Sequence, residues 1–167
     1  MAKVITFSRQ FPKGHPNEGE PTYFVEKLIL GFPAFEQTHP VFDTLHLEGL
    51  GNLDKLWAKK HTIRAGKRFK EGDMFSPRVW LGKPYASKQF AIAPDIKIVK
   101  TYDFDIDECG VITSPIIGTK GYYDIMNEVA KNDGLELYDF EHWFKFKQPK
   151  PRKPFSGQII CWQDCGY

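Results

Sequence analysis

The chain has 167 residues, of which 41% are apolar and 26% charged, and its formal net charge is +2. This length fits one domain, and a chain of this size buries enough surface to fold without a disulfide or metal staple. Because it holds neither a long apolar run nor a charged-then-apolar leader, we expect no membrane span and no signal peptide. The expected location is the cytoplasm.

The N-terminal part of the sequence predicts a strand, a loop and a helix. Residues 3–8 are rich in β-branched and aromatic side chains, and residues 9–21 are dense in Pro and Gly. Residues 22–31 show helical periodicity, and a Gly and a Pro then end the helix. Its apolar side chains fall on one stripe: Phe24, Val25, Leu28 and Ile29. Residues 33–56 are compatible with either a short helix or an irregular excursion.

The middle of the chain predicts β-structure. Residues 73–81 read as a strand that Pro77 interrupts, and a proline without an N–H is typical of an edge or bulged strand. Residues 94–107 alternate between apolar and polar side chains, so one face of this strand is expected to be buried. The apolar residues on that face are Ile96, Ile98, Tyr102, Phe104 and Ile106.

The C-terminal part predicts two helices and a closing strand. Residues 121–134 read as a helix that ends at a glycine. A second helix over 135–146 begins with Leu135 and Phe140 spaced as a hydrophobic staple around a Glu136–Asp139 capping pair. A Pro- and Lys-rich loop then leads to a strand at 158–162. This order of elements predicts a mixed α+β domain around a small, strongly bent sheet or barrel.

Charge is distributed unevenly along the chain. Residues 51–100 hold 12 Lys and Arg against 4 Asp and Glu, a net charge of +8. Residues 101–146 hold 3 against 10, a net charge of −7. Either the basic segment gives one face a positive potential that attracts phosphate-rich ligands, or the two segments pair with each other in the fold.

The most basic stretch surrounds Thr62. If residues 59–64 are extended, Lys60, Thr62 and Arg64 share one face, whereas a helical turn brings Lys59 next to Thr62. A Thr hydroxyl becomes a nucleophile only when a base takes its proton, and a Lys is such a base only when burial or nearby cations lower its pKa. The stretch therefore has three interpretations: a solvated surface, an anion clamp or a catalytic site.

Aromatic residues follow this basic stretch. Trp80 and Tyr85 alternate with Lys83 and Lys88, and nucleobases stack on exposed aromatic rings while nearby cations hold the phosphates. From the strand pattern we expect Trp80 in the core and Tyr85 partly exposed.

Familiar catalytic and metal-binding motifs are missing from the sequence. It has no Walker loop, no G-x-G-x-x-G, no G-x-S-x-G and no zinc-deaminase signature. Cys109, Cys161 and Cys165 are too few and too irregularly spaced for a structural zinc site. We expect reduced, partly buried thiols and neither a metal nor a cofactor.

The segment "KKHTIRAGKRFKEGDMFSPRVW" resembles the central motif of the ASCH domains, which are relatives of the PUA domain. In that motif a Lys-x-x-Thr-Ile-Arg segment precedes a Gly-Asp that leads into a barrel strand. The flanking elements, including "AKNDGLELYDFEHWF" and "GQIICW", occur in the expected order, so the resemblance covers most of the chain. It implies one domain over 1–167, a PUA-like small β-barrel with peripheral helices, and elaborations at 33–56 and 82–95.

The resemblance also implies a function. ASCH domains are regarded as modules that bind or process RNA, so the primary expectation is binding of RNA or a modified nucleotide in a basic cleft. The residues expected to bind the nucleic acid are Lys60, Arg64, Lys67, Arg68, Arg78, Lys83, Tyr85 and Lys88.

A bacterial branch of the family hydrolyses N4-acetylcytidine, which gives the alternative function. Carried over to this chain, its catalytic Lys and Thr fall on Lys59 and Thr62. Its Glu falls near Asp133, which is one methylene shorter. In that chemistry Lys59 activates Thr62 to attack the acyl carbonyl, Asp133 shuttles a proton to the leaving N4, and Arg64 or backbone amides stabilise the oxyanion.

Overall fold

A computed structural model of the chain describes residues 2–32, 55–118, 120–144 and 153–167, so most of the ambiguous segment 33–56 lies outside the described residues. Eight strands and three helices occur in the described part, which confirms a mixed α+β fold. The helices are α1 (Phe24–Leu30), α3 (Tyr122–Asn132) and α4 (Leu137–Trp143). The strands are β1 (Lys3–Thr6), β2 (His61–Ala65), β3 (Met74–Trp80), β4 (Gln89–Ala91), β5 (Ile96–Lys97), β6 (Lys100–Ile106), β7 (Ile112–Thr113) and β8 (Phe155–Cys161).

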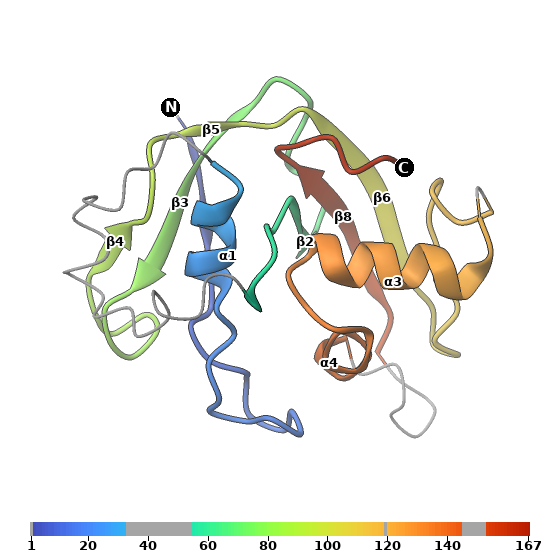
Figure 1. Cartoon of the computed structure of the whole chain (residues 1–167), viewed down its shortest axis with the longest axis horizontal. Coiled ribbons are helices and arrows are strands. Elements are labelled where there is room, and N and C mark those ends of the chain that lie inside the picture. The colour runs from blue at the N-terminus through green and yellow to red at the C-terminus, as the bar shows by residue number, and fades with distance from the viewer. Residues whose placement is uncertain (1, 33–54, 119, 145–152) are drawn as a thin grey trace.

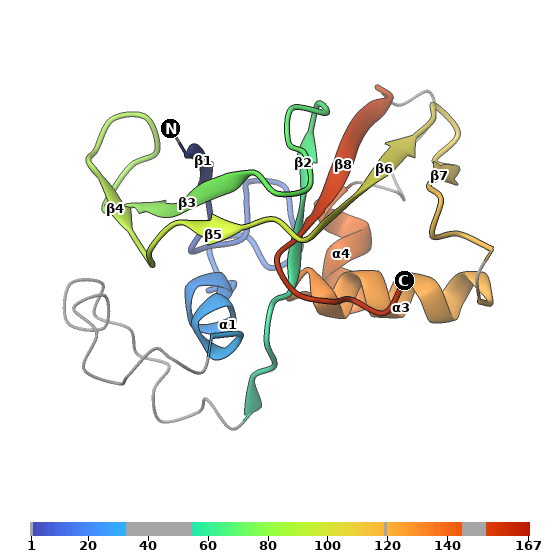
Figure 2. The same ribbon diagram turned by 90° about the horizontal axis from the view of Figure 1, so that it is seen from above.

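The strands form two separate four-stranded sheets, so the predicted barrel is not closed. One sheet has the order β1-β3-β4, with β5 also pairing with β3, and the other has the order β2-β8-β6-β7. Figures 1 and 2 show β2 as the strand of the second sheet that lies nearest the first, with α1 beside the first sheet and α3 and α4 beside the second. Within the described residues no backbone ladder joins β1 to β2; instead the Arg64 Nη2 donates a hydrogen bond to the Thr6 carbonyl at 2.6 Å.

Strand β3 is central in its sheet, so the expectation of an edge strand at Pro77 was wrong. It pairs in parallel with β1 on one side and antiparallel with both β4 and β5 on the other. An N–H at position 77 would point toward β4 and β5, because the Pro77 carbonyl accepts from Ile92 N on that side at 2.9 Å. Ile92 lies between the end of β4 and the start of β5. The break between two partners is what allows a proline inside the sheet.

The segment predicted as one strand over 94–107 forms two strands, β5 in the first sheet and β6 in the second. Its even-numbered apolar residues are buried apart from Tyr102, which is partly buried, as the alternation predicts. Between β5 and β6 the backbone changes partner: Ile98 N donates to Asp73 O and Val99 N to Cys161 O, both at 2.8 Å. The chain thus crosses here from one sheet to the other, and this crossing bends the β-structure.

Helix α1 confirms its predicted apolar stripe, and α1 and α3 both end where the sequence predicts. The four stripe residues of α1 are all buried, as are Ile125, Met126, Val129 and Ala130 of α3. Helix α3 ends in a Schellman motif, in which Gly134 N donates to Lys131 O and Leu135 N to Ala130 O, both at 2.9 Å. Gly134 has φ +81°, which favours glycine. The motif fixes Asp133 as the C-cap residue of α3.

Helix α4 begins without the predicted capping pair. Glu136 is the N-cap residue, but no side chain caps the helix. The carboxylate of Asp139 instead accepts a hydrogen bond from Asn17 Nδ2 at 2.8 Å. Leu135 and Phe140 are both buried, so the apolar half of the prediction holds.

A single apolar cluster connects the two sheets and the helices. It includes Phe75 from the first sheet, Ile159 from the second and Leu28 and Val129 from the helices, each fully or almost fully buried. A search of the described residues found no helix with the length and apolarity that a membrane span requires.

Candidate functional site

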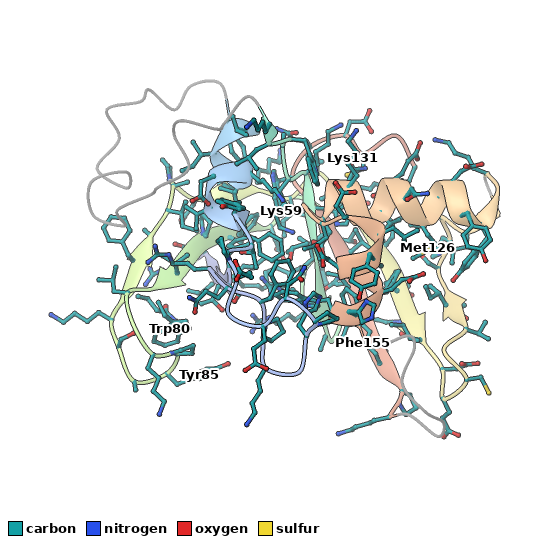
Figure 3. The ribbon with its side chains drawn as sticks, turned by 60° about the horizontal axis from the view of Figure 1, so that its bottom comes forward. Lys59, Trp80, Tyr85, Met126, Lys131 and Phe155 are labelled. Carbon is teal, nitrogen blue, oxygen red and sulfur yellow. The ribbon has the colours of Figure 1, made fainter. Side chains whose placement is uncertain are left out.

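A pocket of about 200 Å³ opens between the two sheets. Its buried lining includes Lys59, Thr62 and Asp133, the three residues predicted to be catalytic. Trp80 and the highly exposed Tyr85 also line it, and Figure 3 shows these two side chains to one side of Lys59. The pocket is smaller than the roughly 300–1,000 Å³ typical of drug-sized ligands, so it suits a ligand about as large as one base or nucleoside.

The backbone before β2 brings Lys59 into the pocket. Lys59 N donates to Lys27 O at the end of α1, and Lys60 N donates to Asn132 O at the end of α3, both at 2.8 Å. These bonds hold residues 59–60 between the ends of two helices. Since the regular strand begins only at His61, Lys59 and Thr62 both line the pocket although an unbroken strand would place them on opposite faces.

Lys59 and Asp133 form a buried ion pair at the C-terminus of α3. The Lys59 Nζ lies 2.5 Å from Asp133 Oδ1 and also donates to the Asp133 carbonyl. The exposed fractions of the two residues are only 1% and 5%. Lys27 makes a similar contact with the next carbonyl of the chain, since its Nζ donates to Gly134 O at 2.7 Å. Two buried ammonium groups thus satisfy carbonyls at the negative end of the helix dipole.

Burial moves the two pKa values of this pair in opposite directions. Desolvation lowers the pKa of Lys59 to about 8, although the Asp133 carboxylate opposes the shift. Desolvation also raises the pKa of Asp133, and Lys59 opposes that shift. Both directions favour moving the proton from Lys59 to Asp133, which leaves the pair neutral overall in either form. A neutral Lys59 amine is the form that can accept a proton from Thr62.

The desolvation of Lys27 can be tested by measuring how the unfolding free energy depends on pH. Burial lowers its pKa from 10.5 to about 8, so between these values the unfolded chain binds more protons and stability rises with pH. We expect the unfolding free energy of the wild type, minus that of Lys27→Met, to increase from pH 8 to pH 10 by on the order of 1–3 kcal/mol. Urea unfolding across this range measures the difference, and a constant difference would contradict the prediction.

Strand β2 brings Thr62 and Arg64 to the pocket on one face, as the extended interpretation predicts. Thr62 is 4% exposed, and its hydroxyl makes no hydrogen bond to any other described residue. Arg64 donates through Nη2 to Thr6 O, whereas its buried Nε has no partner in the described part of the chain. The pocket therefore holds a hydroxyl that is available to a ligand, whereas the unpaired Arg64 Nε is buried.

His61 lies next to Asp133 and contacts Tyr167, and no sequence pattern predicted either residue as part of the site. His61 is fully buried, with its Nδ1 3.8 Å from Asp133 Oδ1. Its Nε2 is 2.8 Å from the Tyr167 hydroxyl, which also accepts from Asn132 Nδ2 at 3.1 Å. Desolvation holds the pKa of His61 well below its usual value, so the ring is neutral at pH 7. Only the fold brings residue 167 to residue 61.

The outer part of the pocket is aromatic. Trp80 is half-buried rather than part of the core, because it lies on the face of β3 opposite the fully buried Phe75 and Val79. Its ring centroid lies 5.3 Å from that of Tyr85, whose exposed fraction of 91% exceeds the partial exposure expected. Phe7 also lines the pocket, as do Phe24 and Trp143, whose ring centroids lie 5.5 Å apart. The helical periodicity of the sequence around Phe24 and Trp143 predicted that these side chains pack against the core, and it did not predict a pocket.

The remaining predicted nucleic-acid-binding residues lie outside the pocket lining. Lys67 is paired with Asp103 at 3.2 Å and Asp105 at 3.3 Å, so part of the basic segment does pair with the acidic one. Lys60 is half-buried beside the pocket. Four other cations have no carboxylate within 4 Å among the described residues: Arg68, Arg78, Lys83 and Lys88. The pocket lining itself holds only two of the basic residues of this segment among the described residues, Lys59 and Arg64.

The thiols and acidic groups offer no evident metal site in the described ranges. Cys161 is buried, Cys165 is partly buried and Cys109 is exposed, and all three are free. No three His, Cys, Asp or Glu side chains of this part of the chain gather closely enough to hold a metal ion.

Comparisons with protein-family models, with curated proteins and with solved structures gave no match. The ASCH resemblance therefore stays a prediction that rests on the sequence motif and the order of its flanking elements.

Proposed function

We propose that the protein binds a single modified nucleobase, an N4-acylated cytosine, in this pocket and hydrolyses its N4-acyl group. The observation that carries the proposal is the meeting of Lys59, Thr62 and Asp133 in one buried site, although 74 residues separate Lys59 from Asp133. The aromatic lining supports a flat, π-rich ligand, because bases stack on such rings. In this proposal the protein acts in the cytoplasm, where modified RNA and its nucleosides occur.

The chemistry starts from the form of the pair in which Lys59 is a neutral amine and Asp133 a carboxylic acid. Lys59 Nζ takes the proton of the Thr62 hydroxyl while Oγ1 attacks the acyl carbonyl. Arg64 or a backbone amide is the donor for the oxyanion that develops. When the C–N4 bond breaks, Asp133 gives its proton to N4 and cytidine leaves. The acyl group stays on Thr62 as an ester. Water activated by the Lys–Asp pair then hydrolyses the ester and releases the carboxylic acid.

Binding without turnover is the second candidate. It is favoured by the contacts of Lys59, whose ammonium already donates to both the carboxylate and the carbonyl of Asp133. A lysine held in this way stabilises the helix end and positions the pocket without acting as a base. The uncompensated cations outside the pocket would then hold the phosphates of an RNA strand.

The direct test is incubation of the purified protein with N4-acetylcytidine, followed by mass spectrometry of the products. We expect cytidine and acetate to form in equal amounts. N4-methylcytidine is the matched control, since it has no acyl carbonyl and should stay intact. Absence of cytidine from both the nucleoside and an acetylated RNA oligomer would reject hydrolysis. Binding alone then predicts an RNA affinity that falls steeply with salt, because neutralised phosphates release counterions.

A further inference from the structure

The turn between β3 and β4 presents an aromatic side chain to solvent at the mouth of the pocket. Tyr85 is 91% exposed, although it also lines the pocket, and its ring contacts that of Trp80 at an interplanar angle of 51°. Figure 3 shows the Trp80 and Tyr85 side chains close together, away from the helices. An aromatic ring this exposed contributes little to the core, so its position indicates a contact surface for a ligand.

The turn is built to hold Tyr85 in place. The Ser87 hydroxyl accepts from Gly82 N at 3.0 Å and donates to Lys83 O at 3.0 Å, and Ala86 N donates to the same carbonyl at 3.1 Å. Tyr85 has φ +62°, a left-handed conformation that is unfavourable for a residue with a Cβ. The turn therefore keeps an exposed tyrosine at a position where a glycine would fit more easily.

The turn and the strand that carry this aromatic pair also carry three cations. Lys83 and Lys88 are exposed on the same turn, and Arg78 precedes Trp80 by two residues, which places both on one face of β3. In the part of the chain that the structure describes, none of the three has a carboxylate within 4 Å. A stacking surface with unneutralised cations beside it is the arrangement that proteins use for single-stranded nucleic acid.

We propose that Trp80 and Tyr85 form a stacking site for the nucleotide next to the modified base, so that the substrate is single-stranded RNA rather than a free nucleoside. This inference rests on the proposed function. The pocket takes one base, the neighbouring base stacks on the exposed Tyr85 ring, and Lys83 or Lys88 contacts the phosphate that joins them. Recognition at the stacking site is tolerant of sequence, since every base has a flat face.

The test compares kcat/KM for N4-acetylcytidine with that for an RNA pentamer carrying N4-acetylcytidine at its centre. We expect the wild type to favour the pentamer at least about tenfold, the effect of one stacked base. Tyr85→Ala should remove most of this preference, and Tyr85→Phe should keep it. Tyr123→Ala is the control, because Tyr123 is 73% exposed on α3 and should leave the preference unchanged. A pentamer with abasic neighbours keeps its phosphates but should lose the advantage.

Equal losses on nucleoside and pentamer in Tyr85→Ala would overturn the inference, because Tyr85 would then serve the base inside the pocket. A wild type without preference for the pentamer would overturn it as well. If neither substrate is hydrolysed, the stacking site is tested separately by fluorescence anisotropy of a labelled unmodified pentamer. Tyr85→Ala should weaken that affinity about tenfold and Tyr123→Ala should not; an unchanged affinity in Tyr85→Ala rejects the stacking site.

Discussion

Replacement of Thr62 by valine is expected to lower kcat for deacylation by about 10³-fold or more. Valine has nearly the shape of threonine, so the variant removes the proposed nucleophile and little else. The hydroxyl makes no hydrogen bond to another described residue, so its loss leaves no described group unpaired. We therefore expect the unfolding free energy to change by less than about 1 kcal/mol. Mass-spectrometric turnover and urea unfolding give the two measurements.

Thr62→Ser is the matched control for this prediction. It keeps an attacking oxygen at the same position, so it should retain turnover within about tenfold of the wild type. Undiminished turnover in Thr62→Val would exclude Thr62 as the nucleophile. A loss in Thr62→Ser as large as that in Thr62→Val would contradict the prediction too, because serine keeps the attacking hydroxyl and lacks only the methyl group.

Lys59→Met should destabilise the fold by about 3–5 kcal/mol, because it leaves the Asp133 carboxyl buried without its cation. The variant also removes the ammonium from the carbonyl end of α3 and from above the Phe24 ring, 4.4 Å away. Under the proposed function it should abolish turnover too. Denaturant unfolding measures the stability, and Lys60→Met is the control: its side chain is half-buried and makes no ion pair within the described residues.

A double-mutant cycle separates the ion pair from the packing of the lysine chain. Lys59→Met together with Asp133→Asn removes both charges, so the double variant should lose about 2 kcal/mol less stability than the sum of the single variants. Strictly additive losses would show that the two groups do not interact energetically. Greater stability of the double variant than of the wild type would mean that desolvation of the pair outweighs its attraction.

Local pattern was sufficient to predict most of the secondary structure. The stripe of α1, the glycine that ends α3 and the alternation over 96–106 all follow from periodicity and turn chemistry, which depend on neighbouring residues only. The Lys59–Thr62 spacing was likewise visible in the chain. The predictions that failed depended on partners. Pro77 has the expected effect on its ladder, yet only the positions of β4 and β5 decide that the strand is central.

The candidate site illustrates what a sequence can and cannot determine. The residue types of the site could be read from the sequence: a lysine and a threonine in a basic stretch, an acid before a glycine and two aromatic residues downstream. Three features of the site became evident only in the folded chain. Asp133, at the C-cap of α3, pairs with Lys59; Lys67 pairs with Asp103; and Trp80 lines the pocket. The physical reason is that helix and strand patterns are encoded over a few residues. Burial, pKa and charge pairing arise only when packing brings distant segments into contact.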